Sequence, residues 1–291
     1  MHVGFVGTGN MGFPMAANVL KAGHQMTVWD VRPHATTELE RLGARRAAGL
    51  KALAEAVRVT LTSLPNDAIV ESVVAGDGGL LAGAREGDVI FDLSTVSPGS
   101  TRRLAERAAT RGVRVIDAPV SGSVSGAVAG TLAVMVGATE AVAGPYAPVL
   151  RAIGTSVFYL GEVGRGNTLK LLNNLVALTN QAVLCEAMAL ADRLGVPRQM
   201  VGDVVGKSSG ASFILERKLA AVVKHDYQPG FFVDLAYKDL GLALDLAGEA
   251  GARTDLVKQA RQLYGEASKA GLGTLDSSGL LSMLEPPPSS A

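Results

Sequence analysis

The residues of this chain best suited to chemistry are a lysine and nearby amides on the otherwise apolar segment 164–195. At about 100° per residue, Lys170, Asn174 and Gln181 fall within one narrow stripe of a helix, with Asn173 at its edge. A lysine on an apolar helix is costly unless it meets a ligand, so this stripe could bind a substrate and move a proton. The alternative is a lysine that reaches water near the start of the helix. The helix by itself favours a lysine that reaches water. The rest of the chain favours the lysine that meets a ligand.

The helix that carries this stripe is predicted to begin near Asn167, which can cap it, and to end at Leu194. No glycine or proline interrupts the run before Gly195, so it predicts roughly 42 Å of helix at ~1.5 Å per residue. The run is apolar on most sides, and much of it should be buried. We expect more apolar surface than the following helices can cover, and therefore a homodimer or homotetramer.

Three glycines, Gly7, Gly9 and Gly12, follow an apolar strand and open a helix with the spacing G-x-G-x-x-G, with Asn10 and Met11 between the last two. In a dinucleotide-binding fold the first glycine permits a tight turn, and the second lets a pyrophosphate approach the backbone. The third lets helix and strand pack closely, and the helix N-terminus offers N–H groups to the phosphates. The context predicts a dinucleotide site.

Asp30 ends the second predicted strand, where a carboxylate can accept hydrogen bonds from an adenosine ribose. Because a carboxylate repels a 2′-phosphate, Asp30 favours NAD over NADP. Arg32 and His34 follow closely and could soften that preference, so NADP is not excluded.

Two further segments follow predicted strands, at the sheet edge where open α/β folds bind ligands. Leu64 and Pro65 could pack on the cofactor, and Thr95 could hydrogen-bond near its nicotinamide end. The alternative for Asn66 and Ser97 is helix capping, which we accept for both.

A small, polar turn follows the strand that ends at Asp117. Backbone N–H groups of this turn and the Ser121 hydroxyl would form a pocket for a small anion, a carboxylate above all. A plain flexible loop explains the turn equally well when it is taken alone. Further on, Asp234 and Lys238 are spaced as an ordinary helix-surface ion pair, although their apolar neighbours hint at a lysine that points into a cleft.

Short β-rich runs alternate with helical patterns over roughly the first 160 residues, which is typical of a parallel, doubly wound α/β sheet of the Rossmann type. We expect a dinucleotide-binding domain at 1–163, a long interdomain helix at 164–195, and an all-α substrate and oligomerisation domain at 196–291. A proline-rich tail begins at Glu285. The predicted strands are His2–Val6, Gln25–Trp29, Arg58–Ser63, Asp88–Leu93, Arg114–Asp117, Leu132–Val136 and Val157–Leu160, with helices such as Asn10–Ala22, Asp67–Val74 and Ser97–Arg111 between them.

The composition excludes several classes of protein. The chain has 291 residues, is 48% hydrophobic and carries 27 basic and 27 acidic residues, so neither disorder nor nucleic-acid binding is indicated. Cys185 is the only cysteine, which fits a reducing compartment. Charges or amides interrupt the apolar runs and no signal peptide precedes the first strand, so we expect a cytoplasmic protein with no membrane partner. No ligand pattern suggests a metal.

In combination, these motifs resemble the β-hydroxyacid dehydrogenase family, which includes 3-hydroxyisobutyrate dehydrogenases and tartronate semialdehyde, glyoxylate and succinic semialdehyde reductases. The glycine fingerprint, the Asp117-Ala-Pro-Val-Ser-Gly turn and the Gly164-x-Gly-x-x-x-Lys-x-x-Asn-Asn run occur in the family's order. The resemblance implies an obligate oligomer with the long helix as shared core, and a C-terminal domain like that of 6-phosphogluconate dehydrogenase. It implies Lys170 as catalytic acid/base, Asn174 as its substrate-orienting partner, Ser121 and Gly122 as carboxylate ligands, and Leu64, Pro65, Thr95 and Lys238 as dinucleotide contacts. We group Ser123 and Asn173 with the substrate-binding residues.

Two departures from the family pattern bear on specificity. Ser123 stands where the family usually has glycine, and we expect its side chain to crowd a branched substrate and to favour a short or unbranched one. Asp30-Val31 stands where NADPH-preferring relatives carry Asn-Arg, which supports NAD and argues against a glyoxylate or succinic semialdehyde reductase. The related imine reductases lack the lysine, so Lys170 argues against that branch.

These inferences predict an NAD-dependent dehydrogenase of a short 3-hydroxy acid or, in reverse, a reductase of its semialdehyde. Lys170 would take the hydroxyl proton on oxidation, which requires its pKa to fall from the usual value of about 10.4. The alternatives are an NADPH-dependent glyoxylate or succinic semialdehyde reductase and a dinucleotide-binding module without turnover.

Overall fold

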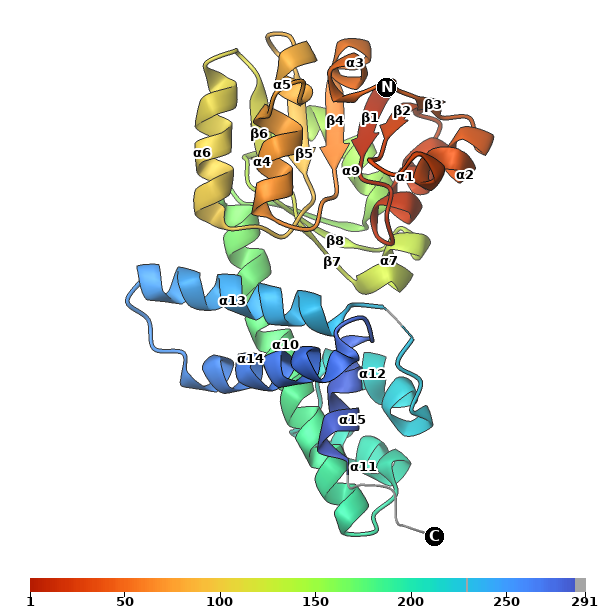
Figure 1. Cartoon of the computed structure of the whole chain (residues 1–291), viewed down its shortest axis with the longest axis vertical. Coiled ribbons are helices and arrows are strands. Elements are labelled where there is room, and N and C mark those ends of the chain that lie inside the picture. Colours follow the sequence, from red (N-terminus) through yellow and green to blue (C-terminus); the bar gives the residue numbers. More distant parts are fainter. Residues whose placement is uncertain (229, 286–291) are drawn as a thin grey trace. The chain divides into compact units, whose positions relative to one another are not determined.

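The computed structural model describes residues 1–228 and 230–285, and it divides into two compact units (Figure 1). The first unit is Met1–Lys170 and the second is Leu171–Ala291. The division falls inside the long helix α10, Arg165–Arg193, which begins two residues before the predicted start and ends one residue before the predicted end. The predicted proline-rich tail lies almost wholly outside the described residues.

The first unit contains a six-stranded parallel sheet in the order β3-β2-β1-β4-β5-β6. This order reverses between β1 and β4, which is the switch point where doubly wound sheets bind dinucleotides. The predicted Rossmann-type sheet is confirmed, and only the two-residue edge strand β3 escaped the sequence analysis. The strands are β1 His2–Val6, β2 Gln25–Trp29, β3 Arg45–Arg46, β4 Val59–Thr62, β5 Val89–Asp92 and β6 Arg114–Asp117.

Side chains of these strands point alternately to the two faces of the sheet, so alternate residues pack in two different hydrophobic cores. Val89 and Phe91 pack with helices α1, Gly12–Lys21, and α9, Ala147–Ile153, whereas Ile90 packs on the opposite face. That face is covered by α3, α4 and α6 (Figure 1). Burial on both faces explains why the strands are continuous apolar runs. The remaining helices of this unit are α2 Thr37–Arg41, α3 Leu50–Ala56, α4 Asp67–Ala75, α5 Leu80–Gly83, α6 Pro98–Ala109, α7 Ser123–Ala129 and α8 Glu140–Ala143.

The last two predicted strands belong to a second sheet, not to the large parallel one. β8, Ala133–Val136, pairs in parallel with β9, Ser156–Tyr159, and antiparallel with the two-residue strand β7, Val120–Ser121. The sequence did not predict β7, because two residues give no alternating pattern to detect. Ser121 therefore lies in a strand, and the turn begins after it.

The start of α10 is held by Asp117 and not by the predicted cap. The two carboxylate oxygens of Asp117 accept hydrogen bonds from the backbone N–H groups of Gly164 and Asn167, both at 2.8 Å. Asn167 is inside the first turn, where its Oδ1 accepts from the N–H of Val96 at 3.1 Å and its Nδ2 donates to Thr101 at 3.2 Å. The prediction of Asn167 as N-cap is wrong. The buried side chain of Asp117, at the end of β6, accepts the N–H groups at the start of the helix instead.

The second unit is helical and forms its own core around α10. Leu178, Cys185 and Met188 of α10 pack with Leu240 of α13 and Tyr264 of α14. Helices α13 and α14 lie side by side and are joined by a short connection (Figure 1). The helices are α11 Arg198–Val205, α12 Phe213–Lys224, α13 Val233–Glu249, α14 Asp255–Ala267 and α15 Leu281–Leu284, with a π-helical turn, η3, at Ser268–Leu272.

Helix α10 is also long and apolar enough to cross a membrane, judged by length and composition alone. This corrects the expectation that charges and amides shorten every apolar run. Half of the apolar window is buried inside the protein. Cys185, in the same helix, is buried as a free thiol, and burial raises its pKa to about 12.

Candidate functional site

In the glycine loop between β1 and α1, the lack of a side chain has a different consequence at each of the three glycines. Gly7 has φ of +86°, and a Cβ there would lie 2.3 Å from the carbonyl oxygen of Ser63. A Cβ at Gly12 would lie 1.8 Å from the carbonyl oxygen of Gly7, so only glycine lets helix and strand meet. At Gly9 the nearest atom is Nη2 of Arg32, at 3.6 Å, so the protein itself leaves space there.

That space fits a dinucleotide. Gly9 leaves open the approach that a pyrophosphate needs, and no side chain of the described residues caps the N-terminus of α1. Asn10 and Met11 lie immediately before this helix, which begins two residues later than predicted, at Gly12. The residues present therefore suit the cofactor that the loop predicts.

Asp30 is buried at the end of β2 and already bonded to the loop. Its Oδ2 accepts from the N–H of Thr8 at 2.8 Å, and its Oδ1 accepts from the N–H and Nε of Arg32 at 2.9 and 3.2 Å. Burial alone would raise the pKa of Asp30, but the hydrogen bonds from Arg32 and Thr8 outweigh it and lower the pKa. The carboxylate is therefore ionised at neutral pH, and Arg32 is held beside it.

The loops after β4 and β5 are joined to each other. The N–H of Leu64 donates to Oγ of Ser94 at 2.9 Å, and the N–H of Ser97 donates to Asp67 at 2.9 Å. Asn66 and Ser97 cap α4 and α6 as predicted, with acceptor distances of 3.0 and 3.1 Å. Pro65 is exposed and Thr95 is partly buried, and each lies three residues after the end of its strand, β4 or β5, at the carboxyl edge of the sheet.

The polar turn after Ser121 contains unusual backbone conformations. Gly122 has φ of +134°, and Ser123 follows with φ of +62°, one of two non-glycine residues with positive φ in the described chain. Ser123 then begins α7, and its hydroxyl lies 2.9 Å from that of Ser125. Glycine adopts positive φ more easily than serine, which accounts for the family's usual glycine here. The predicted crowding of a branched substrate by Ser123 stays a prediction.

Lys170 and Asn174 are both buried, with 7% and 6% of their surfaces exposed, and Gln181 is 1% exposed. The predicted stripe is therefore an inward-facing one, and the alternative of a lysine that reaches water is wrong. Lys170 and Asn174 are one helical turn apart and share a face of α10. Asn173 is exposed, and its Nδ2 donates to Oδ1 of Asn174 at 3.0 Å.

Asp239, next to Lys238 in the sequence, is a site residue to which the sequence analysis gave no role. Its Oδ2 accepts from Nδ2 of Asn174 at 2.6 Å, and its Oδ1 lies 3.0 Å from Nζ of Lys238 in an ion pair without hydrogen-bond geometry. The partner that the structure gives Lys238 is thus Asp239, whereas Asp234 accepts from the hydroxyl of Ser268. Asp239 is 2% exposed. Because it binds Nδ2 of Asn174, it fixes the amide so that Oδ1 of Asn174 points away from Asp239.

Within the first unit, the start of α10 is bound to the same sheet edge as the glycine loop. Asn167 binds the residue after Thr95, and Asp117, which holds the helix, ends β6 four residues before Ser121. Lys170 follows Asn167 by less than one turn. A parallel sheet of this order, with a dinucleotide loop and a buried lysine at its carboxyl edge, is typical of an oxidoreductase that uses a dinucleotide.

Comparisons with known proteins agree with this class of protein and indicate a family within it. Residues 2–161 match the NAD binding domain of 6-phosphogluconate dehydrogenase, and residues 164–284 match the family described as NAD-binding of NADP-dependent 3-hydroxyisobutyrate dehydrogenase. The chain is 39% identical to 2-(hydroxymethyl)glutarate dehydrogenase of Eubacterium barkeri, over 98% of this chain and 95% of that protein. It is 39% identical to 3-hydroxyisobutyrate dehydrogenase of Pseudomonas aeruginosa, over 90% of each.

A solved structure indicates the same family. The crystal structure of 3-hydroxyisobutyrate dehydrogenase from Salmonella typhimurium superposes with a TM-score of 0.89 at 33% identity, over 97% of this chain and 99% of that one. The chain therefore belongs to the β-hydroxyacid dehydrogenase family, as its motifs indicate. It is an oxidoreductase that acts on the CH–OH group of small hydroxy acids with NAD(P).

Proposed function

We propose that the protein oxidises a short 3-hydroxy acid with NAD, or reduces the corresponding semialdehyde with NADH. The observation that carries this proposal is the buried Lys170, on one face of α10 with Asn174. The names of the two relatives support the substrate class, because 2-(hydroxymethyl)glutarate and 3-hydroxyisobutyrate are both acids with a hydroxyl group on the carbon next to C2. Both are also branched at C2, so they do not favour the crowding predicted at Ser123.

In this proposal each group of residues has one task. The turn at Ser121–Ser123 binds the substrate carboxylate, and Lys170 takes the hydroxyl proton at Nζ and returns it in the reverse direction. Asn174, held by Asp239, donates to or accepts from the substrate, and Asn173 supports its oxygen. The bound nicotinamide supplies a hydride acceptor. Leu64, Pro65, Thr95 and Lys238 are proposed to position that cofactor.

The choice of NAD rests on Asp30. Its carboxylate is buried, ionised and fixed, so a 2′-phosphate would meet repulsion that a ribose hydroxyl would not. Arg32, which would be needed to neutralise such a phosphate, already pairs with Asp30 at 3.2 Å.

The ratio of kcat/KM for NAD over NADP should therefore exceed one by about ten- to hundredfold, a difference of a few kcal/mol at most. The variant Asp30→Asn keeps one of the two acceptor oxygens and removes the charge, so this ratio should fall. Steady-state kinetics over a panel of 3-hydroxy acids, with both cofactors, measures it. A ratio below one for the parent enzyme would assign the cofactor to NADP and favour the NADPH-dependent reductase.

We also propose a homodimer or homotetramer built on α10. Apolar residues of this helix are half exposed along one line: Leu172 at 51%, Val176 at 56%, Val183 at 58% and Leu190 at 57%. At about 100° per residue these four positions fall within roughly 40° of one another, over about 27 Å of helix. An apolar seam of this kind, interrupted between Val176 and Val183 by Thr179, favours association with a second helix.

The variant Val183→Glu should lower the molar mass at micromolar concentration, because a charge in the centre of the seam would have to be buried in the oligomer. Val31→Glu is the matched control, since Val31 is 77% exposed in the first unit and lies outside the seam. Light scattering measures both. A parent protein that is monomeric and fully active at that concentration would remove the proposal.

A further inference from the structure

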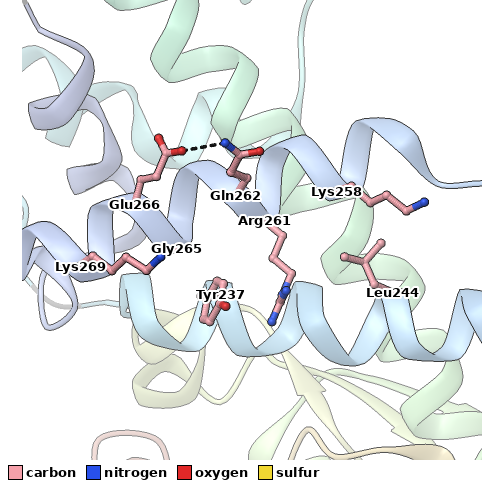
Figure 2. Close-up of a pocket in the computed structure, with 8 residues that line it drawn as sticks. All are labelled: Tyr237, Leu244, Lys258, Arg261, Gln262, Gly265, Glu266 and Lys269. Atoms are coloured by element: carbon pink, nitrogen blue, oxygen red, sulfur yellow. Dashed lines mark hydrogen bonds between the residues drawn. The ribbon is translucent and has the colours of Figure 1, made fainter.

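A groove lined by several charged side chains lies between α13 and α14 in the helical unit (Figure 2). The hollow measures about 390 Å³ and is lined by Tyr237 and Leu244 from α13 and by Lys258, Arg261, Gln262, Gly265, Glu266 and Lys269 from α14 and η3. None of these residues takes part in the proposed oxidation. The volume is within the range of sites for small metabolites.

Two glycines leave space in this groove for Arg261 and for the aromatic ring beside it. A Cβ at Gly241 would lie 3.1 Å from Nε of Arg261, and a Cβ at Gly265 would lie 2.9 Å from the ring of Tyr237. Each glycine thus makes room for the large side chain of the opposite helix. The guanidinium carbon lies 4.2 Å from the centre of the Tyr237 ring, and Figure 2 shows Arg261 reaching from α14 towards α13 beside that ring.

The charge of Arg261 has little to balance it. Within residues 1–228 and 230–285, its Nε is buried without a hydrogen-bond partner. Lys258 and Lys269 add two positive charges to the lining, and Glu266 is the single acid there. The carboxylate of Glu266 is engaged by Nε2 of Gln262 at 2.8 Å, the contact drawn in Figure 2. The lining therefore carries three cations against one anion.

We propose that this groove binds a compact organic anion with at least two negative charges, either a phosphate ester or a dicarboxylate. Arg261 and Lys258 are three residues apart in α14, so they share a face and are separated by about 4.5 Å along the helix axis. Figure 2 draws Lys258 extending away from Arg261, so a bridging phosphate or pair of carboxylates requires the flexible Lys258 side chain to turn towards the guanidinium. The planar guanidinium, fixed by its stacking on Tyr237, presents donors that match either group.

Isothermal titration of the NADH-saturated protein tests this proposal, because bound NADH fills the phosphate-binding loop of the first unit. The probes are glycerol 2-phosphate and glutarate, which separate the two chemical classes. At least one should bind saturably, and Arg261→Gln should weaken that binding by about tenfold or more, the range of a charge-assisted bond. Glu266→Gln should tighten it several-fold, because it removes the only negative charge of the lining.

Arg217→Gln is the matched control, since Arg217 also stacks on an aromatic ring, Phe213, at 5.4 Å but lies outside the groove. It should leave the dissociation constant unchanged. Circular dichroism confirms that the variants are folded, and Glu266→Gln, at an exposed position, keeps the test valid should Arg261→Gln not fold. Binding that is equal in all four proteins, or no saturable binding of either probe to the parent, would overturn the proposal.

Discussion

Replacing Lys170 with alanine is expected to lower kcat by about a thousandfold or more, the usual contribution of a general acid/base. The side chain is buried one helical turn from Asn174, in the first turns of a helix that is bound to the carboxyl edge of the sheet. Since Lys170 serves the proton and not the phosphates, the dissociation constant of NADH should stay within about threefold of the parent value. Stopped-flow turnover and cofactor titration measure the two quantities.

Lys170→Arg makes the same test with the charge retained. An arginine stays protonated at neutral pH and cannot take the hydroxyl proton, so this variant should be as slow as the alanine variant. Lys224→Ala, at an exposed position at the end of α12, should have the turnover of the parent. If kcat of Lys170→Ala is within about tenfold of the parent, another group moves the proton.

Replacing Asp117 with asparagine is expected to lower the free energy of unfolding by about 2–3 kcal/mol. Both oxygens of Asp117 accept backbone N–H groups at the start of α10, so the amide of asparagine would place a donor against one of these donors. Glycines surround the carboxylate closely, and a Cβ at Gly137 would lie 2.0 Å from Oδ1, so the side chain has no room to turn away. Chemical denaturation measures the loss.

Asp92→Asn is the matched control, because Asp92 is equally buried on the neighbouring strand. Its three donors, the hydroxyl and N–H of Ser94 and the hydroxyl of Thr62, all reach Oδ1, which asparagine retains. This variant should lose less than about 1 kcal/mol. A loss for Asp117→Asn no larger than that for Asp92→Asn would show that the helix start does not depend on both carboxylate oxygens.

Burial raises the pKa of both carboxyl groups, so the stability of each variant relative to the parent should change with pH in the same direction. Burial raises the pKa of Asp92, against the hydrogen bonds from Ser94 and Thr62. A carboxyl group of this kind stabilises the fold fully below its unfolded pKa of about 3.9, and that stability is lost as the pH rises through the folded pKa. Asp92→Asn removes this titration, so its stability relative to the parent should increase as the pH rises above about 4.

Local signals allowed most of the first unit to be predicted. The strand boundaries of β1, β2 and β6 match the predictions, and the caps Asn66 and Ser97 bind N–H groups three residues away, so a short window of sequence contains both partners. The lysine stripe follows from helical periodicity. These features depend on residues that are near in the chain, and propensity and spacing describe them directly.

The features that sequence reasoning missed join residues far apart in the chain. Asp117 binds N–H groups 47 and 50 residues later, and Asp239 binds Asn174 across 65 residues. In both regions a local rule favoured another residue: Asn167 as a cap, and Asp234, four residues before Lys238, as its ion-pair partner. In the structure the buried residues Asp117 and Asp239 take these contacts instead. The second sheet was missed for a similar reason, because β7 exists only through its pairing with β8.

The central proposal is that the turn at Ser121–Ser123 binds the carboxylate of a 3-hydroxy acid while its carbinol is oxidised. The most direct measurement compares kcat/KM, with NAD, for the best acid of the panel and for its methyl ester. Because binding of the carboxylate places the carbinol carbon, the ester should lose about a thousandfold in kcat/KM and should also have a lower kcat. Equal values of kcat/KM for the acid and the ester would contradict the proposal.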